Sequence, residues 1–257
     1  MIHELSIVIT TFNRKDLLEE CVDSILKQTY KDFEIIIVDN YSDYDFVKFI
    51  QSFNDKRIRY YQNSNNGIIA VNRNFGINKA KGNYIAFCDD DDIWCKDKLE
   101  LQIDKIKKHN FDLVFTNMKL FKNDVSNIIK VQKSRPVSSF SKLLKCNEIN
   151  TSSVIVKKIK ELHFPEDSIL VGCEDYALWL NLSLEGCSIG LIEEPLVYYR
   201  LGENASKDLA INKHLKMICI FIGLKLSNPN LKVLFQVTKH LLVYIVKKVA
   251  SKLKLYR

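Results

Sequence analysis

Residues 84–94 read Tyr84-Ile85-Ala86-Phe87-Cys88-Asp89-Asp90-Asp91-Asp92-Ile93-Trp94, an apolar run that leads into four consecutive aspartates. Residues 84–88 predict a buried strand, so the aspartates come where that strand ends. Four adjacent negative charges repel one another unless water solvates them or a cation neutralises them. On this stretch alone, a metal site and a solvated acidic turn that caps the next helix are equally good interpretations.

Short apolar runs alternate with helical patterns on the N-terminal side of this stretch. The pattern predicts strands at Leu5–Thr11, Phe33–Val38 and Ile58–Tyr61, and helices at Lys15–Lys27, Phe46–Phe53 and Ile68–Lys81. Strands that are apolar nearly throughout and alternate with helices imply a mostly parallel sheet with helices on both faces. The predicted fold class is therefore α/β.

Polar clusters fall at the ends of three predicted strands: Thr10-Thr11, Asp39-Asn40 and Asp89–Asp92. Ligands of open parallel sheets bind at the carboxyl ends of the strands, so these clusters are expected to meet in one crevice. This convergence favours a binding site over a random surface turn. The chain has no G-x-G-x-x-G after the first strand and no P-loop pattern, which argues against a Rossmann-type dinucleotide site and excludes a P-loop.

The second half of the chain has a less regular pattern. It predicts a helix at Lys96–Lys108, strands at Leu113–Thr116, Thr151–Val156, Ser188–Ile192 and Leu196–Tyr199, and a helix at Ala177–Leu184 that Glu174-Asp175-Tyr176 opens. Residues 119–148 are predicted to form an irregular loop near the site. Because acids at a helix start interact well with the helix dipole, capping is the alternative role for Glu174 and Asp175.

The C-terminal part is basic. The chain of 257 residues has a net charge of +7, and residues 229–257 carry seven basic residues and no acid. Amphipathic helices are predicted at Ile218–Leu226 and Leu231–Val249. Interleaved apolar residues favour contact with an anionic membrane surface over nucleic acid. A helical pair that packs on the preceding domain or forms a homodimer is the alternative.

Cysteine use and hydropathy indicate a cytosolic protein. The chain has seven scattered cysteines and no C-x-x-C pair, so neither a zinc site nor a disulfide framework is indicated. The N-terminus lacks the features of a signal peptide. No apolar run approaches the ~18 residues that a membrane-spanning helix needs.

Several motifs occur together in a characteristic order. They are Ser6–Arg14, Gln28-Thr29-Tyr30, Phe33–Asn40, Asn65-Asn66-Gly67, Arg73–Gly76, Gly82–Phe87 ahead of the aspartates, Glu174–Trp179 and Pro195–Arg200. With this order and spacing, the chain resembles the family 2 glycosyltransferases, inverting enzymes of the GT-A fold that use nucleotide-sugar donors. The resemblance covers residues 5–206. Each motif alone is weak, but the ordered set is specific.

The resemblance implies a domain organisation and an activity. A GT-A catalytic domain is expected at 1–206, with a Rossmann-like nucleotide-sugar-binding half at 1–110, an acceptor-binding half at 111–206 and a basic amphipathic helical tail at 207–257. The enzyme is expected to transfer a hexose or N-acetylhexosamine from a UDP-sugar to a glycan, preferably one linked to a lipid diphosphate. Its role would be in surface polysaccharides such as the O-antigen of lipopolysaccharide, and its location cytoplasmic and peripheral on the inner face of the plasma membrane.

The resemblance also implies roles for the donor-site residues. Thr11 and Phe12 are expected to line the nucleotide base, and Asp39 to hydrogen-bond it. Arg73 would face the nucleotide or its diphosphate. Asp89 and Asp90 would contact the ribose or outer-shell water.

A second set of residues is implied in metal binding and catalysis. Asp91 would ligate a divalent metal, Mn²⁺ or Mg²⁺, which stabilises the departing diphosphate, while Asp92 starts the next helix. Asp175 would be the general base for the acceptor hydroxyl, with Glu174 in support. Trp179 would touch the acceptor, or else be a core residue.

The chain departs from the family pattern at two places. It has Val38-Asp39-Asn40-Tyr41-Ser42 where many relatives have Asp-Asp-Gly-Ser, and Leu201-Gly202-Glu203-Asn204 where many carry a His that is sometimes a metal ligand. Glu203 is the candidate substitute for that His. Two functions from other classes stay open: a sugar nucleotidyltransferase, although the usual Gly-rich basic loop is missing, and a non-catalytic metal- or membrane-binding adaptor.

Overall fold

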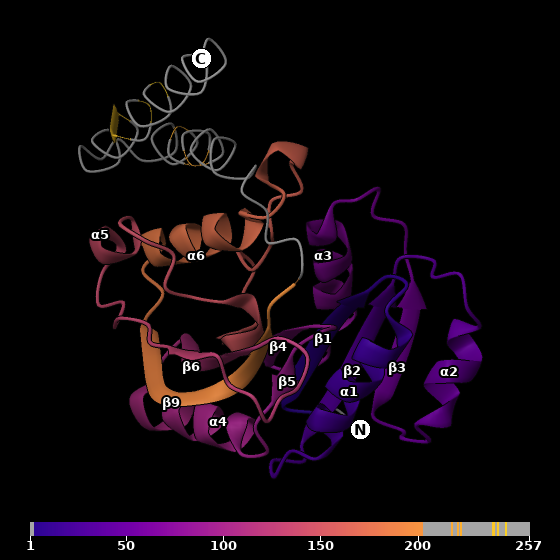
Figure 1. Ribbon diagram of the computed structural model, residues 1–257. Coiled ribbons are helices and arrows are strands. Elements are labelled where there is room, and N and C mark those ends of the chain that lie inside the picture. The colour runs from indigo at the N-terminus through magenta and orange to yellow at the C-terminus, as the bar shows by residue number, and fades with distance from the viewer. Residues whose placement is uncertain are drawn as a thin grey trace, which may run out of the picture.

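The fold is given by a computed structural model that describes residues 3–202 and isolated positions between 217 and 245 (Figure 1). The tail predicted at 207–257, with its membrane and homodimer alternatives, lies outside the described residues apart from those positions. Glu203 lies outside them as well.

Nine strands of the described chain form one sheet, in the order β3-β2-β1-β4-β8-β6-β9-β5 with β7 paired to β6. The strands are β1 (Leu5–Thr11), β2 (Phe33–Asp39), β3 (Ile58–Gln62), β4 (Tyr84–Asp89), β5 (Ile93–Trp94), β6 (Leu113–Phe121), β7 (Lys130–Gln132), β8 (Ile155–Lys157) and β9 (Ile189–Arg200). Strands β1–β4 are parallel, as predicted. Beyond β4 the sheet is mixed, because β8 runs antiparallel to both β4 and β6.

Helices cover both faces of the sheet (Figure 1). Helices α1 (Lys15–Leu26), α2 (Phe46–Ser52) and α4 (Lys98–His109) contribute to the core on one face, and α3 (Ile69–Lys79), α5 (Phe140–Leu143) and α6 (Glu174–Leu184) to the core on the other. The centre of β1 is apolar because both of its faces are buried: Val8 points into the second core, whereas Ile7 and Ile9 point into the first. The sheet thus holds the carboxyl ends of β1, β2 and β4 at one edge.

The sequence prediction was wrong in several places in the second half. Two separate strands were predicted around Pro195, but β9 is one strand, and its pairing with β6 shifts register between Thr116 and Met118. Such an irregularity lets a proline lie within a strand. Residues 119–148 are not all irregular, since β6 runs on to Phe121 and β7 and α5 follow.

Close backbone packing explains one of the glycines that precede β4. A Cβ at Gly82 would lie 2.7 Å from the carbonyl carbon of Leu5 and the amide nitrogen of Ser6 at the start of β1. These are backbone atoms, which cannot rotate away as a side chain can. Gly82 therefore lets β4 enter the sheet directly beside β1.

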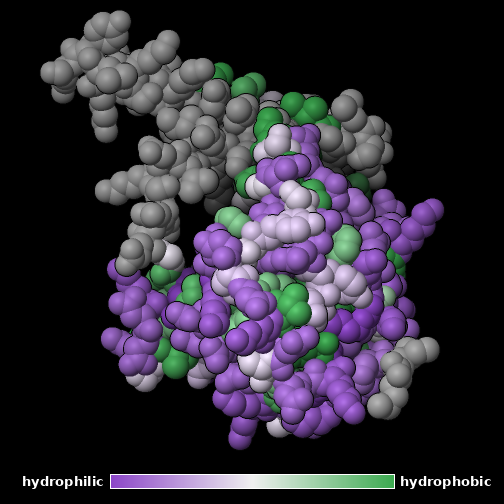
Figure 2. All heavy atoms as spheres, turned by 90° about the vertical axis from the view of Figure 1, so that its right-hand side faces the viewer, coloured by the Kyte–Doolittle hydropathy of each residue, from purple (hydrophilic) through white to green (hydrophobic). Residues whose placement is uncertain are grey.

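The outer surface of the first half is polar. Figure 2 shows the side of the molecule on which α2 and β3 lie, where hydrophilic residues predominate and hydrophobic ones form small separate groups. This pattern is ordinary for a face that contacts water. Within the described residues, no helix combines the length and the hydropathy needed to cross a membrane.

Candidate active site

The four aspartates form a tight turn at the carboxyl end of β4. The Asp92 backbone N–H donates to the Asp89 carbonyl oxygen at 3.1 Å, which folds Asp90 and Asp91 into the tip. The side chains of Asp89 and Asp91 are 30% and 26% exposed, whereas those of Asp90 and Asp92 are buried. The turn therefore presents two carboxylates outward and keeps two inside.

Arg14 supplies part of the positive charge that this turn needs. Its Nη1 lies 3.0 Å from Asp90 Oδ1 and 3.1 Å from Asp91 Oδ2. Burial raises the pKa of Asp90 to about 6, although Arg14 acts against the rise. Burial and the nearby Asp89 carboxylate also raise the pKa of Asp91. A further cation at Asp91 would thus be favourable.

Asp92 is not the start of the next helix, so that prediction was wrong. Strand β5 follows Asp92, and α4 begins at Lys98 with Asp97 at its N-cap. Asp92 is fully buried, and its Oδ1 accepts the backbone N–H of Arg200 at 3.1 Å. Burial raises the pKa of Asp92 well above its ordinary value. Asp92 thereby fixes the end of β9 against the acidic turn.

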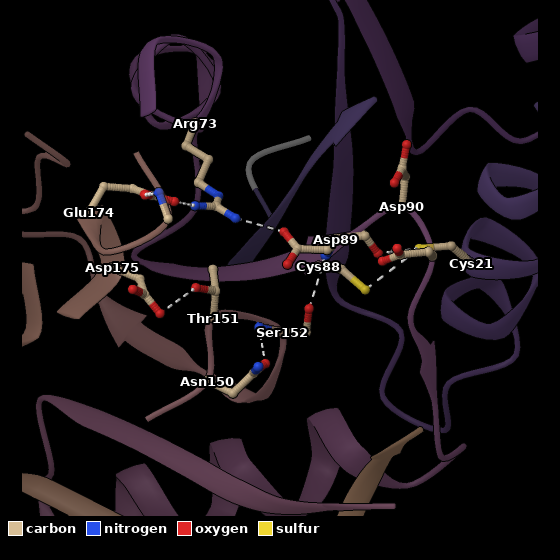
Figure 3. A network of polar contacts seen from close by, with 12 residues as sticks. Cys21, Arg73, Cys88, Asp89, Asp90, Asn150, Thr151, Ser152, Glu174 and Asp175 are labelled. Carbon is tan, nitrogen blue, oxygen red and sulfur yellow. Dashed lines mark hydrogen bonds and ion pairs between the residues drawn. The ribbon is translucent and has the colours of Figure 1, made fainter. Parts of the chain in front are cut away.

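Arg73 of α3 connects the acidic turn to the start of α6 (Figure 3). Its Nη2 donates to Asp89 Oδ1 at 2.7 Å, and its Nη1 donates to Glu174 Oε1 at 2.8 Å. Arg73 is only 5% exposed, and its guanidinium lies 5.3 Å from the centroid of the Phe164 ring. The arginine expected to face the nucleotide thus has its charge shared between two protein carboxylates.

Asp175 lies in the first turn of α6, beside a cavity. Its Oδ2 accepts from Thr151 Oγ1 at 3.4 Å and from Asn147 Nδ2 at 3.3 Å. Burial and the adjacent Glu174 raise the pKa of Asp175 to about 6, against the opposing charge of Arg73. The cavity has a volume of about 230 Å³. A half-buried carboxylate with a pKa near neutrality at a cavity has the properties of a general base.

A short 3₁₀ helix at Thr151–Ser153 holds the two carboxylate centres together. Ser152 Oγ accepts the backbone N–H of Asp89 at 3.0 Å, and Thr151 contacts Asp175 (Figure 3). Asn150 caps this turn by accepting the Ser152 N–H at 3.0 Å. We predicted a strand at Thr151–Val156 and missed this function of the turn. The signal was present in the sequence, because Asn150 precedes three hydroxyl residues and Asn is a favoured cap.

A second cavity, of about 380 Å³, opens at the carboxyl ends of the parallel strands. Its walls include Thr11, Phe12 and Asp90, three of the predicted donor-site residues, together with Arg14, Asn40 and Asn65. Phe12 is 50% exposed, so part of its surface is available to a stacking partner. The predicted convergence at this edge is confirmed, because Thr11, Asn40 and Asp90 represent all three polar clusters in one cavity.

Asp39 does not present its carboxylate to this cavity. It is fully buried and accepts hydrogen bonds from the Ser42 N–H and hydroxyl and from Gln62 Nε2. Asn40 lines the cavity instead, and its Oδ1 accepts the Asn65 backbone N–H at 2.9 Å. The direct base contact expected of Asp39 is therefore not available in this arrangement, because its oxygens hold the Asn40–Ser42 turn.

Trp179 is a core residue. It is fully buried, and its ring centroid lies 6.0 Å from that of Phe164. The structure therefore supports the core alternative, and the acceptor contact predicted for Trp179 is wrong for this arrangement. Trp179 still contributes to the site indirectly. Its burial anchors α6 in the core, and α6 carries Asp175 in its first turn.

Removing the Arg73 guanidinium should destabilise the protein. Arg73→Met would leave the buried carboxylate of Glu174 and the partly buried one of Asp89 without a cation, at a cost of about 3–5 kcal/mol in the free energy of unfolding. Urea unfolding followed by circular dichroism measures this loss. Lys27→Met is the control, since the exposed Lys27–Asp23 pair (3.7 Å) lies away from the site and should contribute about 1 kcal/mol or less. Equal stability of the Arg73→Met and wild-type proteins would contradict the bridging role.

Comparisons with known proteins identify the family of this chain. Residues 6–164 match the family described as Glycosyl transferase family 2. The Escherichia coli protein described as UDP-Glc:alpha-D-GlcNAc-diphosphoundecaprenol beta-1,3-glucosyltransferase WfaP is 33% identical over 234 residues, which are 84% of this chain and 91% of WfaP.

Two solved structures have a similar fold. S. aureus TarS 1-349 in complex with UDP matches with a TM-score of 0.67 and 19% identity, over 86% of this chain and 65% of that one. The mannosyltransferase PcManGT from Pyrobaculum calidifontis, in complex with GDP-Man and Mn²⁺, matches with a TM-score of 0.60 and 14% identity, over 99% of this chain and 81% of that one. The chain therefore belongs to glycosyl transferase family 2 and is a glycosyltransferase with the GT-A fold.

Proposed function

We propose that this glycosyltransferase inverts the anomeric carbon as it transfers a hexose or N-acetylhexosamine from a UDP-sugar to a sugar carried on a lipid diphosphate, in the biosynthesis of a surface polysaccharide. The observation that carries this proposal is the Asp175 carboxylate, which faces a cavity and is joined through Glu174 and Arg73 to the acidic turn. WfaP, by its description, forms a β-linkage from UDP-Glc on α-D-GlcNAc-diphosphoundecaprenol. Family membership favours the transferase over the nucleotidyltransferase and adaptor alternatives.

The donor nucleotide is proposed to bind in the cavity at the strand ends. The exposed Phe12 ring offers a stacking surface for the base, and Asn40 and Asn65 offer amide groups for hydrogen bonds. Arg14 lines this cavity beside Asp90, where a cationic side chain suits a diphosphate. TarS, whose fold is similar, was solved with UDP bound.

The acidic turn fits a divalent cation that the donor helps to hold. No group of three or more His, Cys, Asp or Glu side chains in the described part of the chain forms a ready-made metal cage. Asp91 would instead supply one outward carboxylate, with diphosphate oxygens and water as the other ligands, an arrangement that suits Mg²⁺ or Mn²⁺. Such a cation stabilises negative charge on a departing diphosphate. Burial and the Asp89 carboxylate raise the pKa of Asp91, and a cation at this carboxylate would act against both effects.

Asp175 is proposed to accept the proton of the attacking acceptor hydroxyl. With a pKa of about 6 it is ionised at neutral pH yet more basic than an ordinary aspartate. Thr151 and Asn147 orient its Oδ2, while Glu174 and Arg73 fix the start of its helix. A single displacement by the hydroxyl on the face opposite the leaving diphosphate inverts the anomeric carbon, so an α-linked donor gives a β-linked product.

The product of the reaction tests this function. The protein is incubated with Mn²⁺, a panel of UDP-sugars and α-D-GlcNAc-diphosphoundecaprenol, and the product linkage is determined by NMR. We expect one UDP-sugar to yield a β-linked disaccharide on the lipid. An α-linked product from an α-linked donor would contradict inversion, and transfer from GDP-sugars alone would contradict the donor assignment.

A further inference from the structure

Three cavities adjoin one another in a series that begins at Asp175. Lys145 lines both the cavity at Asp175 and a neighbouring cavity of about 360 Å³, which is the middle cavity of the series. Pro136 and Val137 line both this middle cavity and the third cavity of the series, which has a volume of about 610 Å³. A ligand whose reacting group lies at Asp175 would therefore extend past Lys145 and then along Pro136 and Val137.

The middle cavity carries unpaired positive charge. It is lined by Arg135, Lys142, Lys145 and Glu148, together with Pro136 and Val137. Arg135 is already neutralised, since its Nη2 lies 2.6 Å from Glu148 Oε1. Lys142 and Lys145 are exposed, and neither has an acidic partner within the described residues. The cavity next to the proposed base thus has two ammonium groups free to bind an anion.

One part of the wall of the third cavity is apolar, while Lys105, Glu193 and four serines line other parts. The apolar part comes from the segment after α4, from the residues up to the first residue of α5 and from the start of β9, and consists of Phe111, Val137, Phe140, Ile189 and Leu191. Phe111 packs directly over Gly190, where a Cβ would lie 2.6 Å from a ring carbon, so the ring forms part of this wall. Hydrocarbon is the ligand that such a surface favours.

We propose that this series of cavities is the acceptor site, with the acceptor sugar at Asp175, its diphosphate on Lys142 and Lys145, and the first isoprenoid units against the apolar wall. The inference rests on the proposed function and deepens it, because it assigns the residues that recognise the lipid diphosphate. The order along the cavities, a carboxylate, two cations and then an apolar wall, matches the order of a hydroxyl, a diphosphate and a hydrocarbon chain in the acceptor. Lysine binds phosphate oxygens through charge-assisted hydrogen bonds.

The role of the two lysines is tested by comparing an acceptor that carries a diphosphate with one that lacks it. The Lys142→Gln/Lys145→Gln protein is assayed with α-D-GlcNAc-diphosphoundecaprenol and with the undecyl glycoside of α-D-GlcNAc, which lacks the diphosphate. If each lysine contributes about tenfold, the ratio of kcat/KM for the two acceptors falls on the order of 100-fold, mainly through the KM of the diphosphate acceptor. The KM of the donor should not change. Lys133→Gln is the matched control, because Lys133 is exposed in the same basic segment but lines none of these cavities.

The outcomes separate this inference from the function on which it rests. An unchanged acceptor ratio in the double variant, with a wild-type enzyme that uses the diphosphate acceptor, would overturn the lysine assignment and leave the proposed function intact. A wild-type enzyme that transfers from a UDP-sugar to the glycoside but never to the diphospholipid would overturn both.

The apolar wall is tested by narrowing the third cavity. Ser138, which lines it, is replaced by tryptophan, and geranyl and ethyl diphosphate esters of α-D-GlcNAc are compared as acceptors. We expect the ratio of kcat/KM for the geranyl ester to that for the ethyl ester to fall severalfold in Ser138→Trp. The control Ser126→Trp, which lies outside the cavities, should keep the wild-type ratio. A preference that is the same in both variants and the wild type would overturn the isoprenoid assignment.

Discussion

Asp175→Asn is expected to lower kcat for sugar transfer on the order of 10²–10⁴-fold, the usual contribution of a general base. The amide has nearly the shape of the carboxylate, so it can still contact Thr151 and Asn147, but it cannot accept the proton of the acceptor hydroxyl. Because Asp175 lies outside the wall of the donor cavity, the Kd for UDP should stay within about twofold of the wild-type value. Steady-state kinetics with a UDP-sugar and calorimetry with UDP measure the two quantities.

The pKa of Asp175 adds a pH dependence with a defined sign. Since the general base must be ionised, kcat of the wild-type enzyme should fall as the pH decreases through about 6. The same raised pKa means that the folded protein binds this proton more tightly than the unfolded chain does. Ionisation of Asp175 therefore reduces stability as the pH rises from about 4 to 6. Above that range, Asp175→Asn should be more stable than the wild type by about 1–3 kcal/mol, a difference that vanishes near pH 4.

A control variant at an exposed aspartate separates the effect of Asp175→Asn on kcat and stability from the loss of one negative charge. Asp104 is an exposed residue of α4, so Asp104→Asn should leave kcat unchanged and alter stability by less than about 0.5 kcal/mol. Normal transfer by Asp175→Asn would show that another group takes the proton. An inactive variant that is less stable than the wild type at pH 8 would indicate that Asp175 acts in folding instead.

The first half of this fold was predictable because its strands are buried on both faces. β1, β2 and β4 consist of nearly continuous apolar runs, and each ends in polar residues at the same edge of the sheet. The convergence of Thr11, Asn40 and Asp90 follows from this topology alone. The second half was harder because β8 has three residues and β9 continues through Pro195, so neither gives a clean periodic signal.

Side-chain roles within the site depended on contacts between distant parts of the sequence. Asp39 matches the family motif, yet its oxygens accept hydrogen bonds from Ser42 and Gln62. Gln62 is 23 residues away, so no local sequence pattern predicts this contact. Arg73 likewise meets Glu174 across 101 residues. Burial of Asp92 depends on Arg200 of β9, so the sequence around the aspartates could not distinguish this residue from Asp91.

Removal of divalent metal is expected to abolish transfer, and Asp91→Asn to weaken metal binding. Asp91 is the outward carboxylate at the tip of the acidic turn, and its amide analogue keeps the shape but lacks the negative charge that a hard cation needs. We expect EDTA to reduce activity at least 100-fold with recovery on addition of Mn²⁺. In Asp91→Asn, the Kd for Mn²⁺ in the presence of UDP should rise at least tenfold, as measured by electron paramagnetic resonance of free Mn²⁺.

The comparison of Asp91 with Asp104 decides whether the metal acts at the acidic turn. Asp104→Asn removes the same charge from α4 and should leave both Mn²⁺ binding and activity at wild-type values. Because the binding measurement requires no turnover, it reports on the metal even in a protein that cannot transfer sugar. Undiminished activity in EDTA would contradict a metal requirement. Unchanged Mn²⁺ binding by Asp91→Asn would place the cation on other ligands, and Asp89, the second outward carboxylate of the turn, would then be the next residue to replace.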